Sequence, residues 1–319
     1  MIPYALVSVL LFPVTFAGYV IWVCGALLGG RGSGVSGTAQ GPLSARFFAD
    51  TLGTRRDEPA RRLMLALPNV PSLGLHLFAW PMQTASRLTG HVPRVFRYPY
   101  EGEVVPQYQA AARMTFFDAV VERHLPSVAQ FVILGAGFDT RAFRIPADVP
   151  INSFEVDAPK TQFVKRAALD RAGIASPHVA FVAADFQEDR WFRQLVDAGF
   201  NPGLPALFLW EGVTPYLDRA AVESTLRTIA GTAAGSVVAF DYLTTEALQS
   251  RDLYFRAARA ATRLAGEPLT FGIDSTPPSR ERVEEFVRAC GLELHEQQTF
   301  GETGNSRAWG GFAVAVVPR

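Results

Sequence analysis

The sequence predicts an α/β fold with a doubly wound, Rossmann-like sheet of seven mostly parallel strands. From residue 131 onwards, short apolar runs alternate with helix-compatible segments. The first run, Phe131–Leu134, leads directly into a Gly-x-Gly turn formed by Gly135 and Gly137. Such a turn is typical of folds that bind nucleotide-like ligands, because glycine lets the backbone approach the ligand closely. We expect a helix to begin near Asp139, just after this turn.

The same alternation continues to the end of the chain. Five βα units predict parallel pairing, and two adjacent β-like runs near the C-terminus predict an antiparallel last strand. The expected strands are Phe131–Leu134, Ile151–Val156, Val179–Ala183, Ala206–Trp210, Ser236–Tyr242, Leu292–Phe300 and Gly311–Val317, and the expected helices are Val105–Leu125, Pro159–Ala172, Trp191–Ala198, Ala220–Ala230, Thr245–Leu264 and Ser279–Cys290.

The N-terminus is strongly apolar, since residues 1–30 carry no charged side chain. The run Ile2–Leu28 exceeds the roughly 20 residues that a helix needs to cross a bilayer. A cleaved signal peptide is the alternative, but it usually begins with basic residues and has a shorter apolar core. We therefore expect a transmembrane anchor in residues 1–30. Because basic residues such as Arg31 and Arg46 follow the span, we expect the body of the protein in the cytoplasm.

Residues 31–104 are expected to form a linker and a helical cap before a main domain at residues 105–319. The segment Gly29–Pro42 is rich in glycine and serine, which is typical of a flexible tether. Residues 43–66 carry apolar positions at helical spacing. The segment Leu67–Met82 is apolar and contains three prolines. It is expected to be a loop that covers the core, or else a segment that skims the membrane or lines a substrate channel.

Composition argues against several classes of ligand. The chain has 30 basic and 30 acidic residues, a balance that gives no support to nucleic-acid binding. Its two cysteines, Cys24 and Cys290, lie far apart, and its five histidines are scattered without a zinc-ligand spacing. We therefore expect neither a disulfide framework nor a metal site.

An acidic residue closes the second expected strand. Asp157 follows Gly137 by twenty residues, and the two oxygens of its carboxylate match the spacing of the vicinal hydroxyls of a ribose. Glu155 lies on the same strand face and is the alternative ribose ligand. Thr140 stands where a dinucleotide fingerprint has its third glycine. That departure favours a nucleoside ligand without a pyrophosphate.

Other polar residues stand at or near the same edge of the predicted sheet. Asp185, after the third strand, either accepts a hydrogen bond from the base of a nucleoside ligand or lies solvated in a loop, and Phe186 offers a backbone amide and an apolar face. Glu211 ends the fourth strand, where a buried carboxylate needs a partner. Arg113, on a largely apolar helix, either binds a ligand carboxylate with two nitrogens or lies at the surface. Asp139 caps the expected helix, contacts the ligand, or does both.

Five motifs in this order resemble the leucine carboxyl methyltransferase-like family of class I S-adenosylmethionine-dependent methyltransferases, and within it the bacterial O-methyltransferases linked to polyketide pathways. The resemblance covers about two thirds of the chain, from residue 106 onwards, and leaves residues 1–100 unexplained. The motifs are Ala112–Asp118, Gly135–Arg144, Phe154–Pro159, Ala184–Phe186 with Trp191 after it, and Glu211–Leu217.

The resemblance implies that S-adenosyl-L-methionine is the cofactor and that Glu211 contacts its ammonium group. Joined to the expected anchor, it implies methyl transfer to a carboxylate or hydroxyl of an apolar, lipid-like small molecule. Two alternatives are carboxyl methylation of a protein C-terminus and a catalytically inactive scaffold that binds the cofactor at a membrane. Intact glycines and acids, such as Gly135, Gly137 and Asp157, argue against an inactive scaffold.

The acceptor decides whether a general base is needed. A carboxylate is already nucleophilic, whereas an alcohol or phenol needs a base within hydrogen-bond reach. The candidate bases are His124, His178, Asp241 and Glu267. Asp241 is preferred, because it ends the fifth strand and is expected to face the crevice. Tyr216, in the last motif, packs in the core or faces the substrate.

Overall fold

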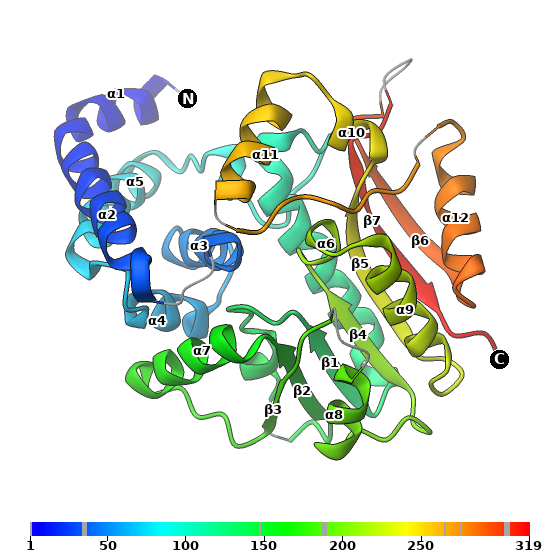
Figure 1. Cartoon of the computed structure of the whole chain (residues 1–319). Helices are drawn as coiled ribbons and strands as arrows, with labels where there is room; N and C mark the ends of the chain where they lie inside the picture. The colour runs from blue at the N-terminus through cyan, green and yellow to red at the C-terminus, as the bar shows by residue number, and fades with distance from the viewer. Residues whose placement is uncertain are drawn as a thin grey trace.

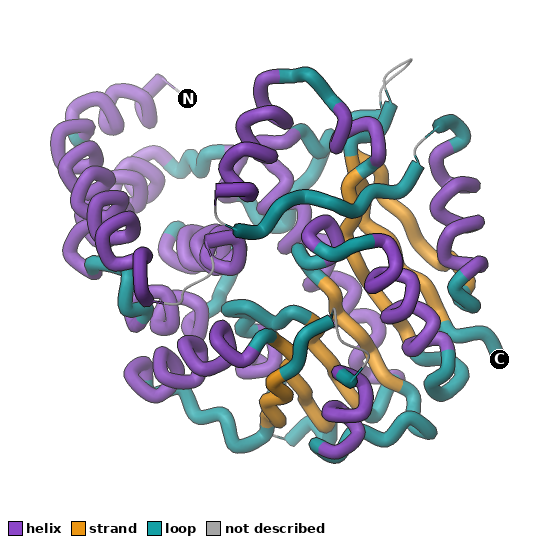
Figure 2. The backbone as a smooth tube through the Cα atoms, viewed as in Figure 1, coloured by secondary structure: helices purple, strands orange, loops and turns teal. Residues whose placement is uncertain are grey.

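The computed structural model describes residues 2–33, 37–146, 148–186, 190–264, 266–274, 276–302 and 307–319. Seven strands form one sheet in the order β3-β2-β1-β4-β5-β7-β6 (Figures 1 and 2). The strands are β1 Gln130–Leu134, β2 Asn152–Asp157, β3 Val179–Ala183, β4 Ala206–Trp210, β5 Val237–Leu243, β6 Glu293–Phe300 and β7 Gly310–Val316.

Strand pairing confirms the predicted sheet. The first five strands pair in parallel, and β7 inserts between β5 and β6 and is antiparallel to both. Each expected strand is present with its bounds shifted by no more than one residue. The order reverses between β1 and β4, so the carboxyl ends of these two strands form the crevice in which doubly wound folds bind their ligands.

Helices cover both faces of the sheet, because side chains alternate along each strand. Val132 and Leu134 of β1 point to the core beneath α8, α9 and α12, whereas Phe131 and Ile133 point to the core beneath α6. The helices of this region are α6 Gln109–His124, α7 Pro159–Ala172, α8 Trp191–Asp197, α9 Arg219–Ala230, α10 Thr245–Gln249, α11 Leu253–Leu264 and α12 Ser279–Ala289.

Two helix predictions in this region are wrong in detail. The expected helix Thr245–Leu264 is two helices, α10 and α11, because Ser250 and Asp252 form local hydrogen bonds that compete with the helical pattern. After β1, the α-helix expected near Asp139 is only the short 3₁₀ helix η4, Arg141–Arg144. Residue 145 that follows is extended, as expected before Pro146.

An N-terminal helical cap packs beside the sheet (Figure 1). It consists of α1 Ile2–Leu10, α2 Phe12–Ser33, α3 Gly37–Thr51, α4 Glu58–Ala66 and α5 Ser72–Thr89. The cap shares an apolar core with α7 of the sheet region, in which Phe47 and Leu63 lie against Val164 and Leu169. This shared core joins the cap to the edge of the sheet near β2 and β3.

The two irregular segments expected in the cap are largely helical. Of the expected tether Gly29–Pro42, residues 29–33 belong to α2 and residues 37–42 to α3, while residues 34–36 lie outside the described residues. Most of Leu67–Met82, expected to be a loop, belongs to α5, which contains Pro81. Helix α5 lies along α2, and Gly18 and Gly74 let the two backbones approach closely. Tertiary packing therefore outweighs the local signals of glycine and proline here.

The single membrane span expected at Ile2–Leu28 is not what the structure has. Within the described residues, no single helix is both long and apolar enough to cross a bilayer. Ile2–Leu10 and Phe12–Ala26 satisfy length and composition only together, and they are bent by 65° at Leu11. Pro13 follows this break and lacks the amide that would continue the helical hydrogen bonds through it.

Candidate active site

A cavity of about 270 Å³ lies at the carboxyl ends of β1 to β4, with α3 on its other side. Its position is the one that the strand order favours for ligand binding. The lining residues are Thr38, Ala39, Pro42, Arg46, Ile133, Gly135–Asp139, Asp157, Ala158, Thr161, Ala184–Phe186, Glu211–Val213, Tyr216, Leu217 and Glu267. Of the predicted cofactor ligands, the structure brings all except Arg113 to this cavity.

The turn after β1 requires both of its glycines. Gly135 and Gly137 have φ angles of +63° and +47°, a region that favours glycine over other residues. A Cβ atom on Gly135 would clash with Val213, and one on Gly137 would lie 3.1 Å from the Cβ of Ala39 in α3. The amides of residues 135 and 136 both donate to the carbonyl of Val156 in β2. The turn is therefore fixed to the sheet and closely covered by the cap.

Asp157 and Glu155, the two candidate ribose ligands, have different surroundings. Asp157 lines the cavity, and its carboxylate accepts from the amides of Gly137 and Ala158. Glu155 does not line it: its carboxylate is buried 2.7 Å from Nζ of Lys165. Burial raises the pKa of Glu155 to about 7, against the opposing effect of Lys165. The placement favours Asp157 as the residue that meets a ligand.

Glu211 and Asp139 share two buried arginines. Nη2 of Arg46, in α3, lies 2.8 Å from Asp139 and 3.1 Å from Glu211. Nη1 of Arg141 contacts the same two carboxylates, at 2.6 Å from Glu211. Asp139 also accepts from the backbone amide of Arg141, which makes it a local cap of η4. At one end of the cavity, two acids and two arginines thus form a compact, nearly neutral cluster.

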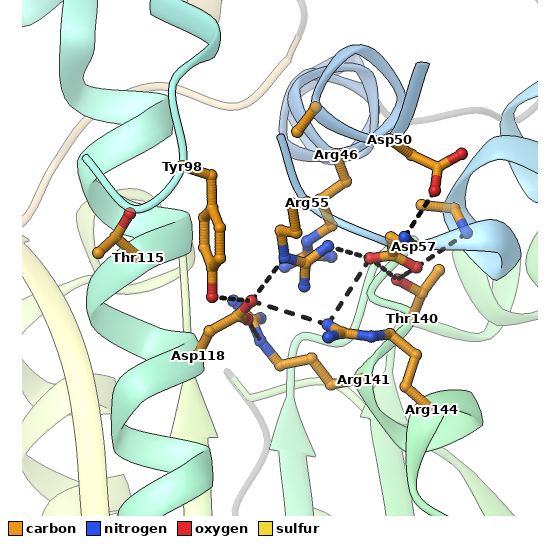
Figure 3. A network of polar contacts seen from close by, with 12 residues as sticks. Arg46, Asp50, Arg55, Asp57, Tyr98, Thr115, Asp118, Thr140, Arg141 and Arg144 are labelled. Carbon is orange, nitrogen blue, oxygen red and sulfur yellow. Dashed lines mark hydrogen bonds and ion pairs between the residues drawn. The ribbon is translucent and has the colours of Figure 1, made fainter. Parts of the chain in front are cut away.

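This cluster continues into a polar network that fastens the cap to the sheet (Figure 3). Asp118 of α6 accepts from Nε of Arg55 at 2.6 Å, from Nε of Arg141 at 2.7 Å and from the hydroxyl of Tyr98 at 3.1 Å. Burial alone would raise the pKa of Asp118, but the arginines outweigh it and hold that pKa well below its usual value. Asp118 is therefore an anion that joins three parts of the chain.

A second carboxylate extends the network to the start of α4. Asp57 caps α4 by accepting from the amide of Ala60, and it also accepts from Thr140 at the end of the glycine turn, with an oxygen distance of 3.0 Å. Thr140 is the residue that replaces the third glycine of a dinucleotide fingerprint. Its hydroxyl therefore has a structural role, since it joins the turn to the cap.

Asp241 was expected to face the cavity, but it does not line it. It is buried, with one oxygen 2.8 Å from Nη2 of Arg113 and the other 2.7 Å from the amide of Gly212. Burial raises the pKa of Asp241, although Arg113 acts against the shift. Arg113 itself lines a smaller neighbouring cavity, together with Arg46 and Glu211. The geometry makes Asp241 a residue that orients Arg113 and the loop after β4.

Of the four candidate bases, Glu267 lines the cavity. Its carboxylate accepts a hydrogen bond from the hydroxyl of Thr38 in α3, across the mouth of the site. His178 lies 3.1 Å from the carbonyl of Ala142, and His124 lies beside His295 at the C-terminus of α6. Neither histidine lines the cavity.

Tyr216, Asp185 and Phe186 also line the cavity. Tyr216, in the 3₁₀ helix η5 Thr214–Tyr216, lines the cavity, and burial raises the pKa of its hydroxyl. Asp185 is exposed at the cavity, and Phe186 packs on Trp191 and Trp210 with ring centroids 5.6 and 6.3 Å away. Because its pKa is raised, the hydroxyl of Tyr216 stays protonated at neutral pH and is a hydrogen-bond donor.

Sequence reasoning missed the contribution of α3, above all Arg46. Arg46 precedes Phe47 and Phe48 in an apolar helix, and an arginine at such a position needs buried acidic partners. That signal indicates a buried ion pair, but it does not identify partners that lie 93 and 165 residues further along the chain.

The fold and the site define a class I, Rossmann-like methyltransferase. Residues 99–230 match the model of the leucine carboxyl methyltransferase family. Over 271 residues, the chain is 32% identical to a predicted S-adenosyl-L-methionine-dependent methyltransferase of Mycolicibacterium gilvum, which covers 81% of this chain and 84% of that protein. The chain belongs to the leucine carboxyl methyltransferase family, and it is an S-adenosyl-L-methionine-dependent methyltransferase.

Two proteins of Mycolicibacterium smegmatis, also predicted to be S-adenosyl-L-methionine-dependent methyltransferases, show similar levels of identity. One is 33% identical over 230 residues, covering 71% of this chain and 72% of that protein. The other is 33% identical over 174 residues, and the chain spans only 53% of its length. The second match also covers 54% of this chain.

Proposed function

We propose that this enzyme transfers the methyl group of S-adenosyl-L-methionine to an oxygen, in a carboxylate or hydroxyl of an apolar small molecule. The lining of the cavity carries this proposal. Apolar side chains such as Ile133, Val213 and Leu217 line the cavity together with its charged groups, and an apolar lining favours an apolar ligand. Acceptors of the polyketide type belong to this class, as the sequence resemblance implies.

The residues of the structure fit the amino-acid part of the cofactor. Nη2 of Arg141 and Nε of Arg113 are buried and make no hydrogen bond to the described residues. Unused guanidinium nitrogens suit a carboxylate, which arginine binds with two parallel hydrogen bonds. We assign the cofactor carboxylate to Arg46, Arg141 and Arg113, and its ammonium to Glu211.

The opposite end of the cavity suits the adenosine part. Asp157 is placed to accept from the ribose hydroxyls, and Asp185 from the adenine amino group. Phe186 supplies an apolar face for the base, since it already packs on aromatic rings. Gly135 and Gly137 line the cavity with backbone alone, so a ligand can approach the turn closely.

When bound, S-adenosyl-L-methionine supplies an electrophilic methyl group, so the protein needs mainly to align the acceptor and exclude water. A carboxylate acceptor needs no base. A hydroxyl acceptor transfers its proton to Glu267, which lines the cavity. The protonated hydroxyl of Tyr216 orients the acceptor oxygen by donating a hydrogen bond. Asp241 keeps Arg113 in place and does not take the proton.

The N-terminal helices extend the proposal to the membrane. Residues 2–26 carry no charged side chain, and many of their apolar side chains are exposed. We infer that these residues hold the enzyme at the cytoplasmic side of a membrane, near acceptors that dissolve in lipid.

Two measurements test this function. Calorimetric titration should show binding of S-adenosyl-L-methionine and no binding of NAD, and a preference for NAD would refute the proposal. Membrane extracts should then be incubated with the enzyme and a donor carrying a labelled methyl group, and the products separated by mass spectrometry. The matched control is the Asp157→Ala variant.

The chemistry of the label distinguishes the possible acceptors. A methyl ester releases labelled methanol in mild base, whereas a methyl ether keeps its label. Label in an apolar small molecule supports the proposal. Label confined to the C-terminus of a protein would replace the acceptor class, and cofactor binding without transfer to any fraction would indicate a scaffold without activity.

A further inference from the structure

We propose that α1, α2 and α5 form a lipid-binding surface that inserts into one leaflet of a membrane, with α11 as a second contact. The inference rests on the membrane attachment in the proposed function, and it specifies the surface and the manner of contact. The lipid surface is defined by the exposed apolar residues Ile2, Leu6, Val9, Leu10, Phe12, Phe16, Tyr19, Val20, Leu73, Trp80 and Leu88.

The exposure of this surface is far above what an ordinary helix of a globular domain shows. In α1, Ile2 is 77% exposed and Leu10 79%. In α2, Phe12 and Phe16 are 59% and 56% exposed, and their rings stack on each other. Exposed apolar side chains on adjoining helices are typical of sites of interaction with membranes or proteins. We therefore expect this surface to bind an apolar partner.

Helix α5, which packs on α2, also carries exposed apolar residues. Leu73 is 64% exposed, Trp80 51% and Leu88 71%. Helix α5 runs along α1 and α2, since Gly18 of α2 approaches the backbone of Leu77 and Tyr4 of α1 packs on His91 just beyond α5. A tryptophan and a tyrosine among exposed aliphatic side chains are typical of the interface between lipid and water.

The surface is rigidly joined to the cap and so to the cofactor cavity. Trp22 of α2 packs on Phe48 of α3 and on Phe78 of α5, with ring centroids 6.2 and 5.5 Å apart. Phe48 lies two residues after Arg46, which contacts the acids of the cavity. Lipid contact at α1 and α2 would therefore place the cavity at a fixed height above the membrane.

Charge complementarity favours a lipid surface over another apolar partner. Arg87 is exposed on α5, one residue before Leu88. Helix α11 carries exposed Leu253 and Leu264 together with exposed Arg256 and Arg263. Arginines beside exposed apolar groups are suited to anionic headgroups, with the apolar groups in the acyl region.

The position of α11 agrees with a second contact. Figure 1 shows α11 on the same upper side of the view as α1, with α3 between and below them. Glu267, just beyond α11, lines the cavity and bonds to Thr38 of α3. The segment that follows α11 is therefore linked to the cap that carries α1.

The dimensions of α1 suit a shallow insertion. Its nine residues span about 14 Å at the usual rise of 1.5 Å per residue, and the hydrocarbon core of a bilayer is about 30 Å thick. Helices that lie in the interface bury their apolar face by roughly 5–10 Å. We therefore expect residues 2–20 to lie in the leaflet that faces the catalytic domain.

Vesicle sedimentation tests the surface with the full chain. The probes are vesicles of phosphatidylcholine, with and without a third of phosphatidylglycerol. The fraction of protein bound to vesicles should be about tenfold lower, or lower still, for the double variant Leu6→Glu, Leu10→Glu, because each substitution places a charge in hydrocarbon. The control is Phe163→Glu, which changes a side chain in α7 that is equally exposed at 75%. Binding should be tighter to the anionic vesicles, and it should fall in an Arg256→Gln, Arg263→Gln variant.

Titration with S-adenosyl-L-methionine accompanies every variant, so that a fault in the fold or in the proposed function is seen separately from a loss of lipid binding. Equal loss of vesicle binding in the Phe163→Glu control, or no loss in the double variant, would overturn the proposed surface. So would a compact dimer in lipid-free buffer that the double variant breaks, because a second copy of the chain would then be the cover.

Thiol labelling distinguishes insertion into one leaflet from a span. Cys24 is exposed and is replaced by Cys24→Ser, whereas Cys290 is buried. A Cys introduced by Ile2→Cys or Phe16→Cys is then the accessible thiol. With protein bound to the outside of sealed vesicles, a polarity-sensitive label should report a shallow depth at both positions, and lipid-borne quenchers of the outer leaflet should reach both. Reaction at residue 2 only with a reagent trapped inside the vesicles would show a span and overturn the inference.

Discussion

The two ends of the cofactor cavity are built from the same kinds of residues in opposite ways. At the Glu211 end, Glu211 and Asp139 are buried against Arg46 and Arg141. At the Asp157 end, the carboxylate of Asp157 is held by two backbone amides. One end therefore offers charges of both signs, and the other offers an acceptor fixed by the glycine turn.

The difference supports the proposed placement of the two parts of the cofactor. A zwitterionic amino-acid group is best met by fixed cations and anions in a region from which water is excluded. A ribose is neutral and needs only acceptors for its hydroxyls. The Glu211 end also joins the cap to the sheet through Arg46, so stability and affinity are linked at that end and separable at the other.

The largest effect is expected from Arg46→Ala at the Glu211 end. Removal of one member of a buried ion cluster leaves Asp139 and Glu211 with Arg141 alone, and should cost about 3–5 kcal/mol of the free energy of unfolding. Chemical denaturation measures this cost, and calorimetry should show weaker cofactor binding in the same variant.

Two variants in the same cap are the controls for Arg46. Arg61→Ala removes an ion pair with Asp50 in which the arginine side chain is 44% exposed, so a loss of no more than about 1 kcal/mol is expected. Arg55→Ala breaks buried pairs with Asp57 and Asp118 that lie outside the cavity. It should destabilise the protein without changing affinity. Equal affinities of the Arg46→Ala and Arg55→Ala proteins would show that Arg46 is only structural.

The next largest effect is expected from Asp157→Ala at the other end. Loss of a charged acceptor for two hydroxyls should weaken cofactor binding by about 100-fold, since a hydrogen bond to a charged group contributes roughly 1.5–3 kcal/mol. Calorimetry measures the affinity, and the near-ultraviolet circular dichroism spectrum checks that the fold is intact. Unchanged affinity with an intact fold would remove Asp157 from the site.

A smaller effect is expected from Asp241→Asn. If Asp241 orients Arg113, the variant should bind the cofactor about tenfold more weakly, in line with the loss of one charge-assisted bond, while the rate at saturating cofactor keeps its pH profile. A general base predicts the reverse, with cofactor affinity unchanged and the rate lost together with the acidic limb of its pH profile, which the pKa of the base sets. Steady-state kinetics across pH separates the two roles.

The sheet could be predicted from the sequence because the residue pattern that marks each strand is local. Each strand is a short apolar run, and each following helix has its own periodicity, so bounds such as Val179–Ala183 and Pro159–Ala172 are confirmed without knowledge of the rest of the fold. The positions of Asp157 and Glu211 at strand ends follow from the same rule.

What the sequence left undetermined depends on distant partners. Proline and glycine punctuation suggested irregular chain in Gly29–Pro42 and Leu67–Met82, but α2 and α5 pack on each other through Gly18 and Gly74. The end of strand five placed Asp241 at the correct edge, yet only the position of Arg113 decides that Asp241 is covered. Buried pairs between residues far apart in the chain leave no local pattern to find.

The smallest expected effect concerns Glu155, the acid that stands behind Asp157 and away from the cavity. Burial raises the pKa of Glu155 to about 7 in the folded protein, whereas the carboxyl of an unfolded chain titrates near 4.3. A carboxyl with a raised pKa contributes stability that is complete below the unfolded pKa and is lost as the pH rises through the folded pKa. Between about pH 4.5 and pH 7, the wild-type protein should therefore become progressively less stable than Glu155→Gln, whose amide imitates the protonated acid and does not titrate. Thermal unfolding of both proteins across this window measures the difference in Tm, which should rise in favour of the variant as the pH rises.

Asp118, whose pKa is lowered, loses its contribution to stability only at more acidic pH, so it does not change stability within this window. A difference that stays constant or changes in the opposite direction would mean that Glu155 is ionised throughout and that its pair with Lys165 outweighs burial.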